Sequence, residues 1–191
     1  IQVQTYPRGT PDWGGDPASP ASPDAAPALP EPSFRAIAMN DAVINAGPPF
    51  RLIELEVAID PALSGTSAIR FGADGVIVAT PSGSTAYNVA AGGPIVSPGL
   101  DGLSLCAICP QSLAFRPVVY PASSETWIAL RRGNKGTTLV LDGQVSTRLT
   151  AGEQVRITRY PRTLRLIHNP EYNYWRMLAH KMHWAAQPRR G

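Results

Sequence analysis

The stretch that decides the fold runs from Asp74 to Pro94 and reads DGVIVATPSGSTAYNVAAGGP. Its apolar first part predicts a short buried strand over residues 75–79, followed by a turn and a short helix over residues 84–91. Gly83 permits a tight backbone, and the hydroxyls of the turn, with the free amides at the helix start, suit a polar ligand. An ordinary helix cap in a well-packed loop explains the same hydroxyls equally well.

Short β-branched and apolar runs surround this stretch, separated by turn residues every eight to twelve positions. This spacing predicts a mainly β, antiparallel, sandwich-like architecture with little helix. Residues 132–136 and 160–162 are expected to form hairpin turns. The predicted strands are residues 1–6, 35–44, 52–59, 67–71, 75–79, 103–108, 126–131, 137–141, 154–159 and 163–167.

The first 33 residues read differently from the rest. Residues 7–33 contain eight prolines and have no hydrophobic periodicity, which predicts a flexible, extended segment after the first strand. We therefore divide the chain into residues 1–33, a strand plus a Pro-rich segment, and residues 34–191, an all-β ligand-binding domain.

The last predicted element is a C-terminal helix. Asn169 is expected to cap it and Pro170 to occupy its first turn, with Trp175, Leu178 and Met182 on one face. His180 and His183 lie three apart on this helix, but without a third ligand we assign them to packing or solvent and predict no metal site.

The two cysteines, Cys106 and Cys109, form a CAIC sequence inside an apolar strand-like run. A redox CxxC pair needs its first thiol at a helix N-terminus. We therefore predict two buried, reduced, structural cysteines.

Composition limits the function classes. The chain has 191 residues, 43% of them hydrophobic, and a formal net charge of +3, which is enough for one core and suits anionic small ligands better than nucleic acid. No apolar run reaches the roughly 18 residues that cross a bilayer. We expect a soluble, cytoplasmic protein that binds neither nucleic acid nor membrane.

The segment DGVIVATPSGSTAYNVAAGGP closely resembles the C-terminal half of NAD kinases, whose hallmark is an Asp-Gly, a strand, TPTGSTAY and a following GGP. The resemblance extends to AMNDAVINAG (38–47), FRPVV (115–119), LDGQ (141–144) and the closing aromatic-rich helix, and so covers roughly residues 34–184. It implies the C-terminal domain of the NAD kinase fold.

The resemblance also implies binding roles. Asn40 and Asp41 match the family's Asn-Glu, which contacts the ribose and phosphate region of NAD, although Asp reaches less far than Glu. Asp74 matches the aspartate that holds the nicotinamide amide, often across a subunit boundary. Asp142 and Gly143 match a later Asp-Gly near the ligand.

The adenine end of the coenzyme is expected to meet the TPSGSTAY turn. Ser82 and Thr85 match positions that face the adenine, Ala86 lies beside it, and Tyr87 lines the pocket. These residue types suit that role, because hydroxyls pair with a purine edge and tyrosine offers a flat amphipathic wall.

The family's catalytic aspartate lies in a Gly-Gly-Asp-Gly turn of an N-terminal α/β domain, and we identify no catalytic residue in this chain. Gly14–Asp16 reads GGD, but Pro17 follows it, and neither a strand before nor a helix after is predicted. We therefore expect this chain to be the coenzyme-binding half, with the N-terminal catalytic half outside it.

The implied reaction is phosphorylation of the 2'-hydroxyl of the adenosine ribose of NAD by ATP, with Mg²⁺ or another divalent cation, to give NADP in a homodimer or homotetramer. Two other interpretations stay open: a non-catalytic coenzyme-binding or regulatory module of the same fold, and a related lipid kinase domain. The isolated chain is expected to be weakly active or inactive.

Overall fold

The computed structural model describes residues 1–10, 29–61, 68–165, 167, 169 and 173–182. The chain forms two compact units, residues 1–160 and residues 161–191. The first unit contains all the strands of the described residues, and the second contains one helix, α3 (Tyr174–Met182).

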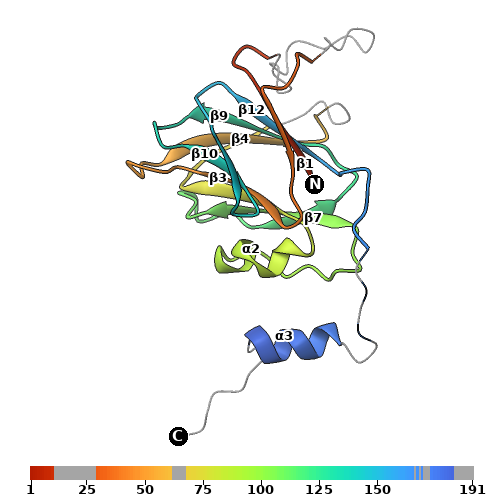
Figure 1. Cartoon of the computed structure of the whole chain (residues 1–191). Helices are drawn as coiled ribbons and strands as arrows, with labels where there is room; N and C mark the ends of the chain where they lie inside the picture. Colours follow the sequence, from red (N-terminus) through yellow and green to blue (C-terminus); the bar gives the residue numbers. More distant parts are fainter. Residues whose placement is uncertain (11–28, 62–67, 166, 168, 170–172, 183–191) are drawn as a thin grey trace, which may run out of the picture. The chain divides into compact units, whose positions relative to one another are not determined.

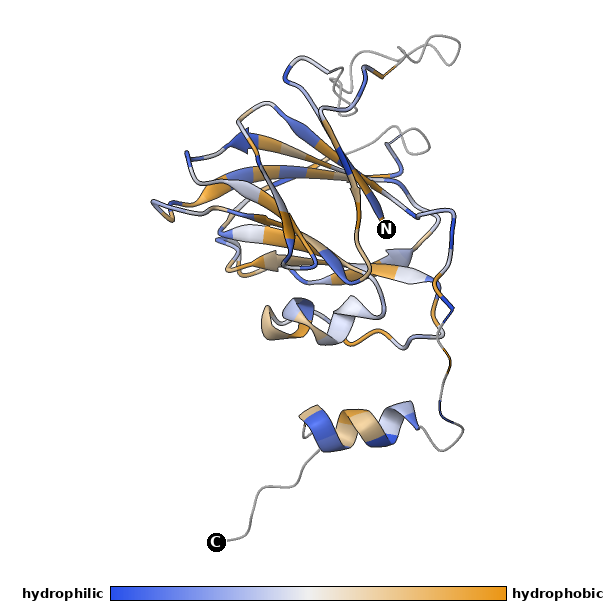
Figure 2. Cartoon of the chain, in the orientation of Figure 1, coloured by the Kyte–Doolittle hydropathy of each residue, from blue (hydrophilic) through white to orange (hydrophobic). Residues whose placement is uncertain are grey.

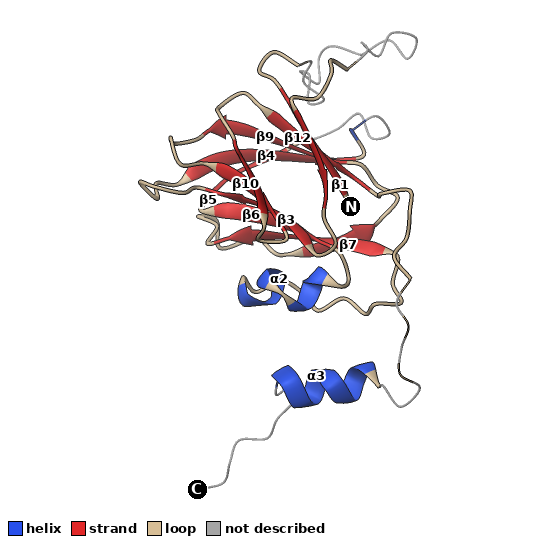
Figure 3. Cartoon of the chain, in the orientation of Figure 1, coloured by secondary structure: helices blue, strands red, loops and turns tan. Residues whose placement is uncertain are grey.

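The first unit consists of two six-stranded antiparallel sheets (Figure 1, Figure 3). The first sheet has the order β2-β1-β12-β9-β4-β5. Its strands are β1 (Gln2–Tyr6), β2 (Phe34–Ile37), β4 (Ile53–Ile59), β5 (Ile69–Ala73), β9 (Thr126–Arg132) and β12 (Gln154–Thr158).

The second sheet has the order β11-β10-β3-β6-β7-β8. Its strands are β3 (Asp41–Asn45), β6 (Gly75–Ala79), β7 (Gly102–Ile108), β8 (Val118–Pro121), β10 (Thr138–Leu141) and β11 (Val145–Arg148). The two sheets confirm the predicted mainly β, antiparallel, sandwich-like architecture.

The core lies between the two sheets. Apolar and polar positions alternate along many strands (Figure 2), so that each strand turns one face inward. Leu55 of β4 and Leu130 of β9 are fully buried and lie opposite each other in register. Each such side chain contributes about 1.5–3 kcal/mol on burial.

The second sheet also has an apolar outer face, which carries the site described below. Val43, Ile77 and Ala79 form a small buried cluster there, with Ala91 packed against it. Short helices follow β6 on this face, namely the 3₁₀ helix η1 (Gly83–Thr85) and α2 (Tyr87–Ala90) (Figure 1).

Several predicted elements differ in the structure. The strand predicted over residues 35–44 is two strands in different sheets, β2 and β3, because the chain turns at Met39 and Asn40. The described residues of 163–167 form no strand, so residues 160–162 make no hairpin. Residues 132–136 carry the chain from one sheet to the other instead of forming a hairpin. The short strands β8 and β11 were not predicted.

The helices differ in detail. The helix predicted over residues 84–91 is broken into η1 and α2 at Ala86, where φ is −94° and ψ is −126°. Helix α3 begins at Tyr174, and the side chain of Asn173 accepts a hydrogen bond from the amide of Arg176 at 3.1 Å. Asn173 is therefore the cap, not Asn169. Pro170 and His183 lie outside the described residues.

Both cysteines are unpaired thiols, but only Cys106 is buried, and burial raises the pKa of its thiol. Cys109 is exposed, because it follows the end of β7 with a positive φ of 45°. The prediction that Cys109 is buried is therefore wrong. Among the described helices, none is long and apolar enough to span a membrane.

Candidate functional site

The TPSGSTAY turn is anchored to the β2–β3 turn. The Thr80 hydroxyl donates to the carbonyl of Met39 at 2.6 Å and accepts from the amide of Gly83 at 3.1 Å. The Thr80 amide also donates to the carbonyl of Asn40 at 2.8 Å. A Cβ on Gly83 would lie 2.0 Å from that same Asn40 oxygen, so glycine is needed here for close approach of two backbones.

A buried network of hydrogen bonds connects η1 and α2 to strand β7 of the second sheet. Asn88 is fully buried, and its Nδ2 donates to the carbonyls of Ser84 at 3.2 Å and Pro94 at 2.9 Å. Its Oδ1 accepts from the hydroxyl of Ser104 on β7 at 3.2 Å. Since a buried amide is stable only when its hydrogen bonds are made, these contacts fix the helix on the sheet.

The β2–β3 turn is held from the other side by Asp142. The carboxylate of Asp142 accepts from the backbone amides of Met39 at 2.8 Å, Asn40 at 2.7 Å and Asp41 at 3.0 Å. Asp142 and Gly143 lie in the β10–β11 turn with φ values of 50° and 68°, a left-handed backbone that Asp and Gly tolerate better than most residues. A residue from the hairpin thus clamps a turn about one hundred positions earlier.

These three turns surround one pocket of about 340 Å³ on the outer face of the second sheet. Three alternate residues of β3 form its floor, which follows from the two-residue period of a strand. Tyr87, whose side chain is 45% exposed, forms part of its wall. The pocket is lined by Asn40, Asp41, Val43, Asn45, Ala86, Tyr87, Val140, Asp142 and Gly143.

Asp41 is a polar group of this pocket that can accept a hydrogen bond from a ligand. Its side chain is buried, and no described residue donates a hydrogen bond to its carboxylate. Burial, and secondarily the negative charge of Asp142, raise the pKa of the Asp41 carboxyl above its ordinary value. A ligand hydroxyl that donates to this group would satisfy a buried acceptor.

The residues that line the pocket fall within one family match. Residues 39–169 match the family model described as the ATP-NAD kinase C-terminal domain. The chain belongs to the NAD kinase family. It is 41% identical to the NAD kinase of Aromatoleum aromaticum over 82% of the chain, and 40% identical to that of Neisseria meningitidis over 80%. These matches confirm the family predicted from the TPSGSTAY segment.

Two solved kinase structures share this fold. Yeast NADH kinase complexed with NADH matches with a TM-score of 0.76 at 25% identity, over 100% of this chain and 51% of that one. An NAD kinase from Archaeoglobus fulgidus in complex with ATP matches with a TM-score of 0.54 at 27% identity, over 81% and 51%. The chain therefore spans about half the length of the NAD kinases it matches.

Six of the nine predicted site residues line the pocket: Asn40, Asp41, Ala86, Tyr87, Asp142 and Gly143. Ser82 and Thr85 do not line it, although the Ser82 hydroxyl donates to Oδ1 of Asn40 at 3.3 Å. The Thr85 hydroxyl makes only a long 3.5 Å contact to the carbonyl of Ser82.

Asp74 does not line the pocket, but it lies next to residues at one end of it: Asn45, which lines the pocket, is opposite Gly75 in register, and the amide of Ala46 donates to the carbonyl of Asp74 at 2.8 Å. Asp74 is exposed and immediately precedes β6, whereas the TPSGSTAY turn follows the other end of that strand. At a rise of ~3.3 Å per residue, the six positions from Asp74 to Thr80 span about 20 Å. Asp74 and the TPSGSTAY turn therefore lie at opposite ends of β6.

Sequence reasoning missed three pocket residues, Val43, Asn45 and Val140. Val43 could have been found, since it shares the parity of Asp41 on the strand predicted over residues 35–44, whereas Asn45 lies one residue beyond the predicted end of that strand. Val140 comes from β10, whose pairing with β3 depends on tertiary structure. The GGD sequence, Gly14–Asp16, lies outside the described residues.

Proposed function

We propose that the full-length protein is an NAD kinase that transfers a phosphoryl group from ATP to the 2'-hydroxyl of the adenosine ribose of NAD. In this proposal the present chain supplies the coenzyme-binding part. The observation that supports it most is the gathering of six predicted coenzyme residues, from three separate segments, around one pocket. The solved relatives are complexes with NADH and with ATP.

The pocket suggests a role for each group. Tyr87 and Ala86 would contact the adenine, and the buried acceptor Asp41 would receive a hydrogen bond from a ribose hydroxyl. Asp142 would act as a positioning residue, because its carboxylate already accepts three backbone amides. Such a domain contributes to phosphoryl transfer by orienting the acceptor, which is a large part of this chemistry.

The role of Asp74 bears on whether the site is shared between subunits. The family resemblance implies that this aspartate holds the nicotinamide amide, often across a subunit boundary. We therefore propose a homodimer or homotetramer in which each coenzyme contacts Asp74 from one subunit and the TPSGSTAY turn from the other.

Catalysis itself is assigned to the full-length protein. We propose that the catalytic aspartate of the family's Gly-Gly-Asp-Gly turn belongs to the other half of the full-length protein. In the described part of the chain, no three His, Cys, Asp or Glu side chains cluster closely enough to hold a metal ion. We propose that Mg²⁺ or another divalent cation binds as a complex with ATP. The cytoplasmic location stays a prediction.

The test is a coupled assay of the full-length protein with ATP, Mg²⁺ and NAD, in which an NADP-specific dehydrogenase reports the product. Tyr87→Ala should raise the dissociation constant for NAD about tenfold or more, the usual cost of losing one base–aromatic contact. Tyr87→Phe, the matched control, keeps the ring and should bind NAD normally. Coenzyme binding without NADP formation would favour the non-catalytic module instead.

Subunit complementation tests the shared site. Asp74→Ala and Tyr87→Ala proteins should each bind NAD poorly, but their co-expression should restore part of the activity, because some mixed oligomers contain one intact composite site. If mixing restores nothing while the oligomers do form, Asp74 does not act across the subunit boundary.

A further inference from the structure

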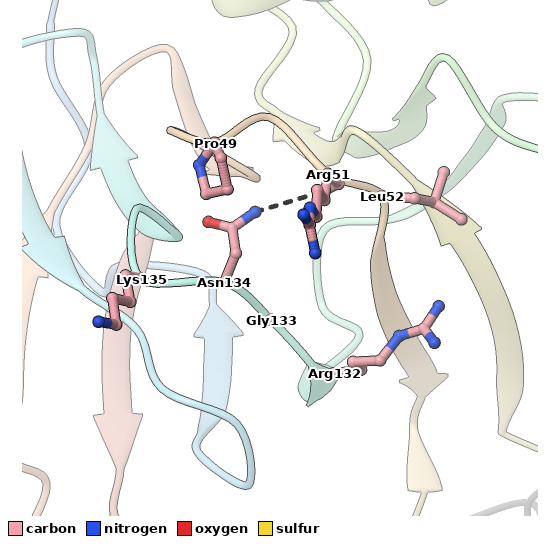
Figure 4. Close-up of a pocket in the computed structure, with 7 residues that line it drawn as sticks. All are labelled: Pro49, Arg51, Leu52, Arg132, Gly133, Asn134 and Lys135. Atoms are coloured by element: carbon pink, nitrogen blue, oxygen red, sulfur yellow. Dashed lines mark hydrogen bonds between the residues drawn. The ribbon is translucent and has the colours of Figure 1, made fainter.

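Two loops form a second and larger pocket, of about 670 Å³, which shares no lining residue with the first. One loop joins β3 to β4, and the other joins β9 to β10. Three cationic side chains line the pocket, Arg51, Arg132 and Lys135, together with the Asn134 amide and the apolar Pro49 and Leu52 (Figure 4).

The two loops are fastened to each other, so the pocket is formed in advance. Asn134 donates from Nδ2 to the carbonyl of Arg51 at 3.1 Å and accepts at Oδ1 from the amide of Gly136 at 2.9 Å. The buried Thr137 hydroxyl accepts from the Asn134 amide at 3.0 Å and donates to the carbonyl of Ala46 at 3.3 Å.

The loop backbones also touch directly. A Cβ on Gly136 would lie 2.2 Å from the carbonyl oxygen of Pro48, so only glycine allows this approach. Because the two loops are already fixed, they lose little further conformational entropy when a ligand binds.

The positive charge of this pocket is not neutralised by the acidic residues nearby. Glu54, which lies opposite Arg132 in the β4–β9 register, forms an ion pair with Arg70 at 3.4 Å. Glu56 is occupied by Arg70 and Arg131. Within the described part of the chain, no carboxylate forms an ion pair with the three pocket cations, and no acidic residue lines the pocket.

We propose that this cationic pocket binds a small organic phosphate. Guanidinium groups present paired N–H donors that match phosphate oxygens, and an ammonium adds a further charge, so three cations suit a dianion better than a monocarboxylate. Pro49 and Leu52 offer apolar contact to the body of the same molecule. The volume lies within the ~300–1,000 Å³ that is usual for small-molecule sites.

The probe for this proposal is phenyl phosphate, titrated calorimetrically into the full-length protein. The double substitution of Arg51→Gln and Arg132→Gln should weaken binding at least about tenfold, because it removes two charge-assisted contacts. The control, Arg162→Gln with Arg165→Gln, removes the same charge from exposed positions outside the pocket and should bind as wild type. Benzyl alcohol, which lacks the phosphate, should bind far more weakly.

The design separates this pocket from the proposed coenzyme site. Tyr87→Ala should leave phenyl phosphate binding unchanged, whether or not the protein proves to be an NAD kinase. Lys135→Gln alone, which removes one exposed charge, provides a second variant and should weaken binding by a smaller factor. The proposal is wrong if wild type fails to bind phenyl phosphate, if the pocket and control variants bind alike, or if Tyr87→Ala abolishes binding.

Discussion

Replacing Asp142 tests whether one carboxylate fixes the geometry of the coenzyme pocket. Its oxygens accept three backbone amides at 2.7–3.0 Å, and a hydrogen bond to a charged group contributes about 1.5–3 kcal/mol. The sum must be reduced, because Asp142 is only half-buried and the Met39 contact is exposed, so water replaces part of what is lost.

We expect Asp142→Ala to lower the free energy of unfolding by about 2–4 kcal/mol, which includes about 1 kcal/mol for placing alanine at a positive φ. A small gain offsets this loss, since Asp41 no longer faces a second negative charge. Asp142→Asn keeps one acceptor and tolerates the left-handed backbone, so its loss should be smaller, about 1–2 kcal/mol.

The assay is urea unfolding followed by tryptophan fluorescence, for which Trp127 is a buried reporter. The matched control is Asp101→Asn, which removes an exposed ion pair with Arg159 and should cost at most about 1 kcal/mol. A loss for Asp142→Ala no greater than that of the control would refute the clamp. NAD affinity should fall in parallel, because the same turn carries Asn40 and Asp41.

Three further outcomes follow from the site. Asn88→Ala should lower the free energy of unfolding by about 2–4 kcal/mol, because it leaves buried polar groups without hydrogen-bond partners. Urea unfolding of the variant and the wild type will measure this difference. Gly83→Ala should lower both stability and NAD affinity, since its Cβ would meet the Asn40 carbonyl at 2.0 Å; normal affinity would contradict the close approach. Folding raises the pKa of Asp41, so the folded state binds the extra proton and stability should fall as pH rises through the raised pKa. Asp41→Asn should remove this fall and be more stable at neutral pH, which urea unfolding at several pH values will measure.

The strands predicted well from the sequence are those whose own residue types indicate a buried strand. Residues 75–79 and 154–158 are apolar or β-branched enough to be recognised without their partners. The break after β2 is different, because the amides of Met39 and Asn40 donate to Asp142, which lies 103 and 102 positions later in the sequence. Local patterns contain no signal for such a contact.

Edge strands form a second class of missed elements. β8 and β11 each pair with a single neighbour and expose most of their side chains. Because half-exposed edge strands need little apolar content, they resemble loops in sequence. Residues 132–136 were predicted as a hairpin turn but connect strands of different sheets. A segment rich in turn residues has the same sequence pattern whether it joins two neighbouring strands of one sheet or crosses to the other sheet.

The site was predictable mainly through its motif. The order of Asn40, Tyr87 and Asp142 along the sequence suggested a common ligand, and the pocket brings these three together. Which of the two pocket carboxylates can bind a ligand was not predictable, since the Asp142 carboxylate accepts three backbone amides and the buried Asp41 carboxylate accepts no hydrogen bond from the described residues. Only tertiary contacts distinguish the two carboxylates.

The order of strands in the first sheet also governs how the chain can fold during translation. β1 with β2, and β4 with β5, form the two edges of that sheet, whereas its centre is β12 and β9, which leave the ribosome later. Roughly 115 residues separate β2 from β12, so at ~5–20 residues per second the first pair waits about 6–23 s for its central partner. A two-stranded pair is marginally stable alone. The emerging chain must therefore be protected from aggregation until its last strand completes the sheet from the middle.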